Sequence, residues 1–339
     1  MGSEQVMQVK VNNTPIGTGA PCYIIAEAGI NHNNDVKQAK EMIATAKKAG
    51  ANAIKFQIFE AEEMCSTNSE YYELFKSLEL PRKVWKDLSD YSKKQGIVFT
   101  ASVFGESSAD FLDELDSPLF KFASADITHL PLLEYVAKKK KPMLLSCGMA
   151  TVGEVEDAVN LIRDNGNDQI ILMHCVSNYP TKFEESNIRV MKTLKDIFQV
   201  PVGFSDHSLG IVAPMAAIAL GADIVEKHYT LDRELPGPDH SLSIEPKELE
   251  DLVKNARIIE SALGNGVKTI TEAELKTREL ARRSIVANTD ISEGTRITKE
   301  MVRIVRPAEG IPPKHLSLVL GRKAKRSIPK EDLLKWDDI

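Results

Sequence analysis

The chain has 339 residues, of which 42% are hydrophobic and 27% are charged, and its formal net charge is −6. This length suits one large barrel with an appended domain, and the composition is that of a soluble globular protein. The negative charge argues against nucleic acid or an anionic membrane as the main partner, while a local cationic pocket can still bind a small acidic substrate.

Neither a secretory signal nor a membrane span is predicted. Residues 1–13, MGSEQVMQVKVNN, contain no apolar signal core, and no stretch approaches the roughly 20 apolar residues that cross a bilayer. The four cysteines form no C-x-x-C pair or regular framework, which is typical of free thiols in a reducing compartment. We therefore expect a cytoplasmic protein.

Apolar, strand-like runs alternate with amphipathic, helix-like stretches. One such stretch, DVKQAKEMIATAKKAG, closes with the glycine that is typical of a helix C-cap. Eight strands, each followed by a helix or a connection of helix length, predict a (β/α)₈ TIM barrel. An open doubly wound sheet gives the same alternation, but no G-x-G-x-x-G phosphate loop follows the first strand. The expected strands cover residues 22–27, 53–57, 97–101, 119–124, 142–147, 170–175, 201–206 and 223–228.

The pattern changes after residue 265. Residues 266–280 are polar and predict a helical linker. Short β-like pieces separated by Gly and Pro follow, so we expect a small β-rich domain over residues 281–339 and assign residues 1–265 to the barrel. A domain of that size is near the lower limit for independent stability.

Polar side chains stand where the expected strands end, which is where TIM barrels carry their chemistry. Lysines with nearby hydroxyls suit a phosphate or a carboxylate. His207 and His228, at the ends of two neighbouring strands, suit a divalent metal of the Mn, Zn or Co type. Glu27 could act as a general base or orient a metal-bound water. The polar residues at these ends are Glu27, Lys55, Gln57, Ser102, Lys121, Ser124, Asp126, Ser146, His174, Ser177, Asn178, Tyr179, Ser205, Asp206, His207, Glu226 and His228.

Purely structural interpretations compete with these roles. Taken singly, a serine or histidine at a strand end is more often a turn, cap or rim residue, whereas a lysine inside an apolar strand must find an anion or extend its charge to solvent. Lys227 is interpreted as structural because strand alternation turns it away from His228. His174 is interpreted as a core residue or as one that supports the site residues from behind, and the lysine run 138–141 as a solvated helix end. Asn31 and His32 stay ambiguous.

Seven segments in register resemble the sialic acid synthase family of phosphoenolpyruvate-dependent nonulosonate synthases, and are similar also to spore-coat polysaccharide relatives. They are YIIAEAGINH, AIKFQ, KFASADITHLPLL, HCVSNYPT, GFSDHS, EKHYTLDRELPGPDH and VRPAEGIPP. The resemblance covers essentially the whole chain, and it identifies the C-terminal segment as an antifreeze-like (SAF) domain. Single motifs such as SDH are weak, but seven in order are highly specific.

The resemblance implies a transferase that condenses phosphoenolpyruvate with an N-acetylated hexosamine, giving a nine-carbon 2-keto acid and phosphate. It implies a Mn²⁺ ion, with Mg²⁺ or Co²⁺ as alternatives, held by His207 and His228, and we expect water and substrate oxygens to complete the shell. It also implies a domain-swapped homodimer in which Arg306 reaches the partner's sugar site. The catalytic residues would be Glu27, His207 and His228, and the substrate-binding residues Lys55, Ser102, Lys121, Ser124, Asp126, Ser146, Ser177, Tyr179, Ser205, Asp239 and Arg306.

Some positions depart from the family pattern. Ser177 stands where asparagine is usual, Asp126 where glutamate is usual, and Ser102 where threonine is common, while segment 60–80 is shorter and poorly matched. The PGPDH run favours a sialic or legionaminic type over a pseudaminic type. The alternatives are a metal-dependent or Schiff-base aldolase that uses a pyruvate-like donor, and a non-catalytic ice- or glycan-binding protein.

Overall fold

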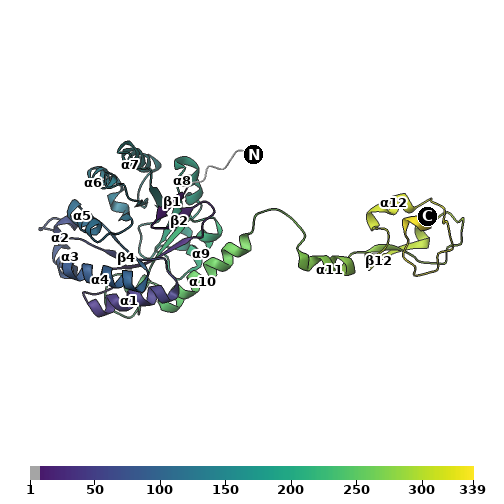
Figure 1. The fold of residues 1–339 in the computed structure, drawn as a ribbon, viewed down its shortest axis with the longest axis horizontal. Coiled ribbons are helices and arrows are strands. Elements are labelled where there is room, and N and C mark those ends of the chain that lie inside the picture. The colour runs from purple at the N-terminus through teal and green to yellow at the C-terminus, as the bar shows by residue number, and fades with distance from the viewer. Residues whose placement is uncertain (1–7) are drawn as a thin grey trace. The chain divides into compact units, whose positions relative to one another are not determined.

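A computed structural model describes residues 8–339, and its internal contacts divide the chain into one unit that ends at Gly264 and another that begins at Asn265. The first unit is a closed barrel of eight parallel strands, surrounded by helices in Figure 1, which confirms the predicted TIM barrel. The strands are β3 (Tyr23–Gly29), β4 (Ala53–Gln57), β5 (Val98–Ser102), β6 (Phe120–Phe122), β7 (Met143–Ser146), β8 (Ile170–His174), β9 (Val202–Asp206) and β10 (Ile224–His228).

Helices connect successive strands of the barrel. Among residues 8–339, none of the helices is both long and apolar enough to span a bilayer. The helices of this unit are α1 (Val36–Ala49), α2 (Ala61–Met64), α3 (Tyr72–Leu78), α4 (Arg82–Gln95), α5 (Glu106–Glu114), α6 (Leu130–Ala137), α7 (Val152–Asp164), α8 (Val190–Phe198), α9 (Val212–Ala219) and α10 (Pro246–Leu263).

Helix α1 illustrates how local sequence sets these elements. The Asp35 carboxylate accepts hydrogen bonds from the backbone N–H groups of Lys37 and Gln38, which satisfies two donors of the first turn. Gly50 ends the helix at φ 90°, a left-handed conformation that glycine adopts without steric cost. Between these caps, Ala39, Met42, Ile43 and Ala46 recur at helical spacing and are buried.

An N-terminal hairpin that the sequence analysis missed closes one end of the barrel. Strands β1 (Gln8–Val11) and β2 (Thr14–Gly17) pair antiparallel. Val9, Val11 and Ile16 are buried in the same apolar cluster as barrel residues such as Tyr23 and Ile171. The hairpin therefore seals the barrel interior with apolar side chains.

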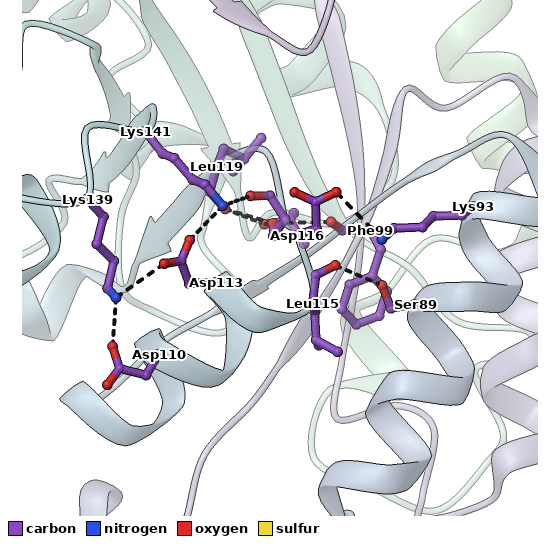
Figure 2. Close-up of polar contacts among 12 residues, drawn as sticks. Ser89, Lys93, Phe99, Asp110, Asp113, Leu115, Asp116, Leu119, Lys139 and Lys141 are labelled. Carbon is purple, nitrogen blue, oxygen red and sulfur yellow. Dashed lines mark hydrogen bonds and ion pairs between the residues drawn. The ribbon is translucent and has the colours of Figure 1, made fainter.

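The lysine run 138–141 is only partly solvated, so the prediction of a solvated helix end is wrong for two of its members. Figure 2 shows Lys139 between Asp110 and Asp113 of α5, with Nζ–O distances of 2.7 and 3.4 Å. Lys141 lies 2.6 Å from Asp113 and donates a hydrogen bond to the Ser117 carbonyl at 3.0 Å. These bonds fasten α5 to the segment that enters β7.

The second unit has its own small core. Helix α11 (Glu272–Ala281) contains no buried residue, and it precedes the antiparallel strands β11 (Ser284–Ala287) and β12 (Val302–Val305) and the short helix α12 (Leu316–Val319). The core residues come from widely separated parts of this unit. They are Ile285, Ala287, Ile291, Ile297, Val302, Ile311, Val319, Ala324, Ile328, Leu334 and Ile339.

Candidate active site

The carboxyl ends of the barrel strands enclose a cavity of about 220 Å³. Ten of the residues predicted from sequence line it, and they come from all eight strands or the loops that follow them. These ten are Glu27, Lys55, Ser102, Lys121, Ser124, Ser146, Tyr179, Ser205, His207 and His228. The remaining lining residues are Gln57, Met64, Phe104, Ala123 and Glu226.

Two buried lysines dominate the floor of this cavity. Lys55 donates to Ser102 Oγ at 2.9 Å, and Lys121 donates to Ser146 Oγ at 2.7 Å. Each lysine is only 3% exposed, so its charge is poorly screened by water. Burial lowers the pKa of Lys121, whereas the pKa of Lys55 is raised because nearby carboxylates outweigh its burial. The pattern of ammonium groups beside neutral hydroxyls suits an anion with several oxygens.

Glu226 is the central acidic group, and the sequence analysis placed it at a strand end without assigning it a role in the site. Its Oε1 lies 3.7 Å from Lys55 Nζ and 3.6 Å from Lys121 Nζ, and it accepts a hydrogen bond from Ser205 Oγ at 3.0 Å. Burial alone would raise its pKa, but the two lysines and the serine bond hold that pKa below its ordinary value. The signal was present in the sequence, because Glu226 precedes His228 by two positions and so faces the same side of the strand.

Glu27 is held differently. Its Oε2 lies 2.8 Å from Lys55 Nζ, and the side chain is almost completely buried. Burial raises the pKa of Glu27 to about 7, with Lys55 opposing the shift and Glu226 adding to it. One carboxyl of the cavity is therefore ionised while the other can exchange a proton near neutral pH, which is the property of a general acid or base.

The two histidines predicted as metal ligands lie edge to face, with ring centroids 5.4 Å apart and ring planes inclined by 66°. His207 Nδ1 donates to the Val176 carbonyl at 2.7 Å, which leaves Nε2 free to bind a ligand. Burial lowers the pKa of both histidines, so the neutral, metal-binding form is favoured. His228 Nδ1 is buried without a hydrogen-bond partner in the part of the chain described, 3.7 Å from Asp239 Oδ2.

This donor set fits a divalent metal. Two neutral imidazoles with free nitrogens suit a divalent transition metal, with the remaining positions open to water or substrate oxygens. Within residues 8–339, no cluster of three or more His, Cys, Asp or Glu side chains is arranged to hold a metal, so protein ligation would rest on the two histidines. The half-exposed Tyr179 stacks on His207 with centroids 4.1 Å apart and limits the orientations of that ring.

The hydroxyls of Ser124 and Ser177 pack against Gly148, a residue that the sequence analysis did not select. The Gly148 backbone N–H donates to Ser124 Oγ at 3.1 Å, and Ser124 Oγ lies 3.0 Å from Cys175 Sγ. A Cβ atom at position 148 would overlap Ser177 Oγ and would lie 2.7 Å from Ser124 Oγ. Ser177 Oγ is buried with no hydrogen-bond partner in the described structure, so this hydroxyl is available to an incoming group.

The loop that carries Asp239 is fastened to the loop after β3. Asn31 Nδ2 donates at 3.0 Å to both the Tyr229 carbonyl and Ser243 Oγ, and Ser243 Oγ in turn donates to the Asp239 carbonyl at 2.6 Å. Asn31 is buried, so these bonds face little competition from water. Asn31 is thus a structural residue that positions Asp239 at the edge of the site, although Asp239 does not line the cavity itself.

Ser177 and Asp126 do not line the cavity either, and Arg306 belongs to the second unit. Asp126 lies on the 3₁₀ turn Ser124–Thr128, where burial raises its pKa to about 6. Arg306 is exposed and follows β12 in the second unit. The barrel thus gathers the predicted lysines, histidines and most of the serines around one cavity, and the roles assigned to all of the site residues stay predictions.

The structure decides the ambiguous cases. His174 is buried in the barrel and hydrogen-bonds to the Ser186 carbonyl at 2.9 Å, as expected for a core residue. His32 is fully buried and packs edge-on against Trp85 with ring centroids 5.5 Å apart. Lys227 is fully buried against Asp206 on the face of β10 opposite His228, as strand alternation predicted.

Comparison with known proteins adds an independent line of information. Residues 42–268 match the model of the NeuB family, and residues 282–339 match the SAF domain. The second match agrees with the β-rich C-terminal domain expected from the sequence.

Relatives and a solved structure align over most of the chain. An uncharacterized protein of Methanocaldococcus jannaschii is 46% identical over 98% of both chains. The N,N'-diacetyllegionaminic acid synthase of Legionella pneumophila is 39% identical over 100% of this chain and 99% of its own. The crystal structure of N-acetylneuraminic acid synthetase from Leptospira borgpetersenii, in complex with citrate, has a TM-score of 0.76 and 40% identity. It covers 80% of this chain and 95% of that one.

Proposed function

The chain belongs to the NeuB family of synthases, and from that premise we propose that it condenses phosphoenolpyruvate with an N-acetylated hexosamine. The acceptor would be N-acetylmannosamine or a 2,4-diacetamido analogue, and the products a nine-carbon 2-keto acid of sialic or legionaminic type and inorganic phosphate. The observation that carries the proposal is one cavity in which two buried lysines with serine partners lie near the two histidines.

The lysine side of the cavity supports an anionic donor. Lys55 and Lys121 would bind the carboxylate and phosphate of phosphoenolpyruvate, with hydroxyls such as Ser102 and Ser146 as neutral donors. Glu226 would hold both ammonium groups in place through its contacts at 3.6 and 3.7 Å. The two ammonium groups and the Glu226 carboxylate leave a net positive charge, and a bound divalent ion would supply the further positive charge needed to balance the phosphoenolpyruvate anion.

The histidine side supports an aldehyde acceptor. His207 and His228 would hold the Mn²⁺-type ion, which supplies Lewis-acid polarisation of the aldehyde oxygen when bound. Tyr179 and Asp239, at the outer edge, would contact the amino sugar and orient its C1 carbon toward C3 of the donor.

In the proposed reaction a carbon–carbon bond forms between C3 of phosphoenolpyruvate and C1 of the sugar, water adds at C2, and the C2–O bond to phosphate breaks. The water oxygen becomes the keto oxygen at C2, and the two water protons go to the former aldehyde oxygen, which becomes a hydroxyl, and to the departing phosphate. Glu27 would take the proton of that water, since its pKa of about 7 lets the carboxylate accept a proton at neutral pH. Retaining that proton in a buried carboxyl also keeps it available for the departing phosphate.

Release of inorganic phosphate tests the proposal directly. Purified enzyme with Mn²⁺ and phosphoenolpyruvate would be given a panel of N-acetylated and 2,4-diacetamido hexoses. We expect stoichiometric phosphate and 2-keto acid with at least one of them. Glu27→Gln should lower kcat by roughly 10²-fold or more, the usual contribution of a general base. Absence of phosphate release with every sugar would contradict the proposal.

An aldolase that uses a pyruvate-like donor is the second candidate. It would also need a buried lysine, and Lys121, whose pKa is lowered by burial, has that property. The salt-bridged carboxylate beside it and the second lysine favour a phosphorylated donor instead. Borohydride trapping with pyruvate separates the two, because only a Schiff-base aldolase would become covalently labelled.

A further inference from the structure

A buried ion pair lies behind the two histidines, on the face of β9 and β10 that is turned away from the cavity. Asp206 and Lys227 are register partners in the barrel, and their Oδ2 and Nζ atoms are 2.6 Å apart. Their side chains are 1% and 0% exposed. Each is the residue immediately before one of the histidines, His207 and His228.

Asp206 also closes a turn around His207. Its Oδ1 accepts a hydrogen bond from the Ser208 backbone N–H at 3.0 Å, and its Oδ2 accepts one from Ser208 Oγ at 3.0 Å. Lys227 Nζ donates to the Ser208 carbonyl as well. The two neighbours of His207 in the chain, Asp206 and Ser208, therefore both accept a hydrogen bond from Lys227. The ring of His207 itself donates to the Val176 carbonyl.

These bonds connect the backbone of β10 at His228 to the turn that presents His207. Buried ion pairs contribute little net stability, because the cost of removing two charges from water offsets their attraction. A well-packed apolar pair would serve stability equally well, so the polar pair is better explained by the geometry that it imposes. Hydrogen bonds in this dry environment are strong and directional.

We propose that Asp206 and Lys227 are positioning residues that set the separation and orientation of His207 and His228 as paired ligands of a divalent cation. The inference rests on the metal site of the proposed function. It assigns a role to two residues that do not touch the cavity, and it predicts an effect on metal binding that is separable from protein stability.

The test uses a double variant and a matched control in the full chain. Asp206→Leu with Lys227→Met removes the hydrogen bonds of Asp206 to Ser208 and the ion pair with Lys227, and it leaves no unpaired buried charge. The control is Lys195→Met with Asp223→Leu, because that ion pair, at 2.8 Å, meets the same two strands at their opposite ends. Mn²⁺ binding to metal-free protein is measured by calorimetry, histidine nitrogen coupling by pulsed EPR, and folding by thermal unfolding.

We expect the Kd for Mn²⁺ to rise at least about tenfold in the Asp206/Lys227 variant, the usual effect of losing groups that orient metal ligands. Its histidine couplings should change, while the control should bind Mn²⁺ with the wild-type Kd and couplings. An Asp206/Lys227 variant that is folded and binds Mn²⁺ like wild type would overturn the inference.

Asp206→Asn covers the case in which the double variant does not fold. Its amide oxygen can still accept the hydrogen bond from the Ser208 N–H, but the variant lacks the charge that pairs with Lys227. We expect an intermediate loss of Mn²⁺ affinity, and an unchanged Kd in this variant would overturn the inference. If the wild-type chain binds no Mn²⁺, the metal site of the proposed function is refuted. This outcome differs from failure of the positioning role, in which the wild-type chain binds Mn²⁺ and the variants bind it equally well.

Discussion

At the residue scale, the site depends on a position that carries no side chain. Gly148 leaves space for the hydroxyls of Ser124 and Ser177 and donates its own N–H to Ser124. We predict that Gly148→Ala displaces these hydroxyls and raises the KM for phosphoenolpyruvate at least about tenfold, since a bond to a charged group contributes roughly 1.5–3 kcal/mol. Steady-state kinetics with each substrate varied in turn would measure this.

Gly153→Ala is the matched control for that change. A Cβ atom there would find only Thr151 Oγ1, at 4.0 Å, and it would lie in the first turn of α7. Alanine is favoured over glycine in helices by roughly 1 kcal/mol, so this variant should be slightly more stable, with unchanged kinetics. An unaltered KM for phosphoenolpyruvate in Gly148→Ala would show that Ser124 and Ser177 do not bind the donor.

A second residue-scale prediction concerns stability and pH. Burial lowers the pKa of His32 from its ordinary 6.5 to about 4, so the folded barrel keeps this imidazole neutral. The unfolded chain binds the proton first as the pH falls. The stability contributed by neutral His32 is therefore full above pH 6.5 and is lost progressively between pH 6.5 and about 4. His32→Gln should remove this part of the pH dependence.

The measurement is urea unfolding at pH 7.5 and pH 4, followed by the fluorescence of Trp85, which packs against His32. Trp336, in the second unit, would be replaced by Phe in both proteins so that only the barrel is reported. Between these pH values, wild type should lose about 3 kcal/mol more unfolding free energy than His32→Gln. Equal losses in the two proteins would mean that His32 does not titrate as described.

At the element scale, the strands were predictable and their mutual stagger was not. Residues 142–147 and 170–175 are nearly continuous apolar runs, so the existence of these strands follows from local pattern. Alternation then correctly separated Lys227 from His228 and would equally have selected Glu226. The Asp206–Lys227 pair and the contacts of Gly148 with Ser124 and Ser177 depend on which residues of neighbouring strands lie side by side. A single sequence carries no direct signal of that register.

The missed hairpin had a weaker signal that was nevertheless present. In β1, exposed Gln8 and Lys10 alternate with buried Val9 and Val11, as a strand with one buried face requires. Four residues are too few to distinguish such alternation from chance. Only the apolar barrel end that the hairpin covers explains why these short strands form.

The attachment of the loop that carries Asp239 predicts how the sugar acceptor binds. Asn31 holds the loop that carries Asp239 through the Tyr229 carbonyl and Ser243. Asn31→Ala should raise the KM for the sugar about fivefold or more while leaving the KM for phosphoenolpyruvate unchanged, because the lysine pocket lies elsewhere in the cavity. Asn167→Ala is the control, since its buried amide bonds to the Lys141 carbonyl, before β7. If Asn31→Ala raised the KM for the sugar and the KM for phosphoenolpyruvate equally, the substitution would have disturbed the whole site and not the Asp239 loop alone.

At the scale of the whole molecule, we expect the SAF domain to contribute to the synthase activity of the barrel. The family resemblance implies a homodimer in which Arg306 of one chain completes the sugar site of the other. On that hypothesis, removing residues 281–339 leaves a folded barrel with little synthase activity. Full activity of the truncated chain would exclude any catalytic role for the domain, whichever chain provides it.

Mixing two inactive variants distinguishes a swapped arrangement from one within a single chain. His207→Ala damages the barrel part of the site, and Arg306→Ala damages the part assigned to the SAF domain. In a swapped dimer, a mixed pair contains one site built from the intact barrel of one chain and the intact SAF domain of the other. With random pairing, co-expressed variants should regain about one quarter of the wild-type sites. If each chain completes its own site, every site carries one defect, and co-expression restores no activity.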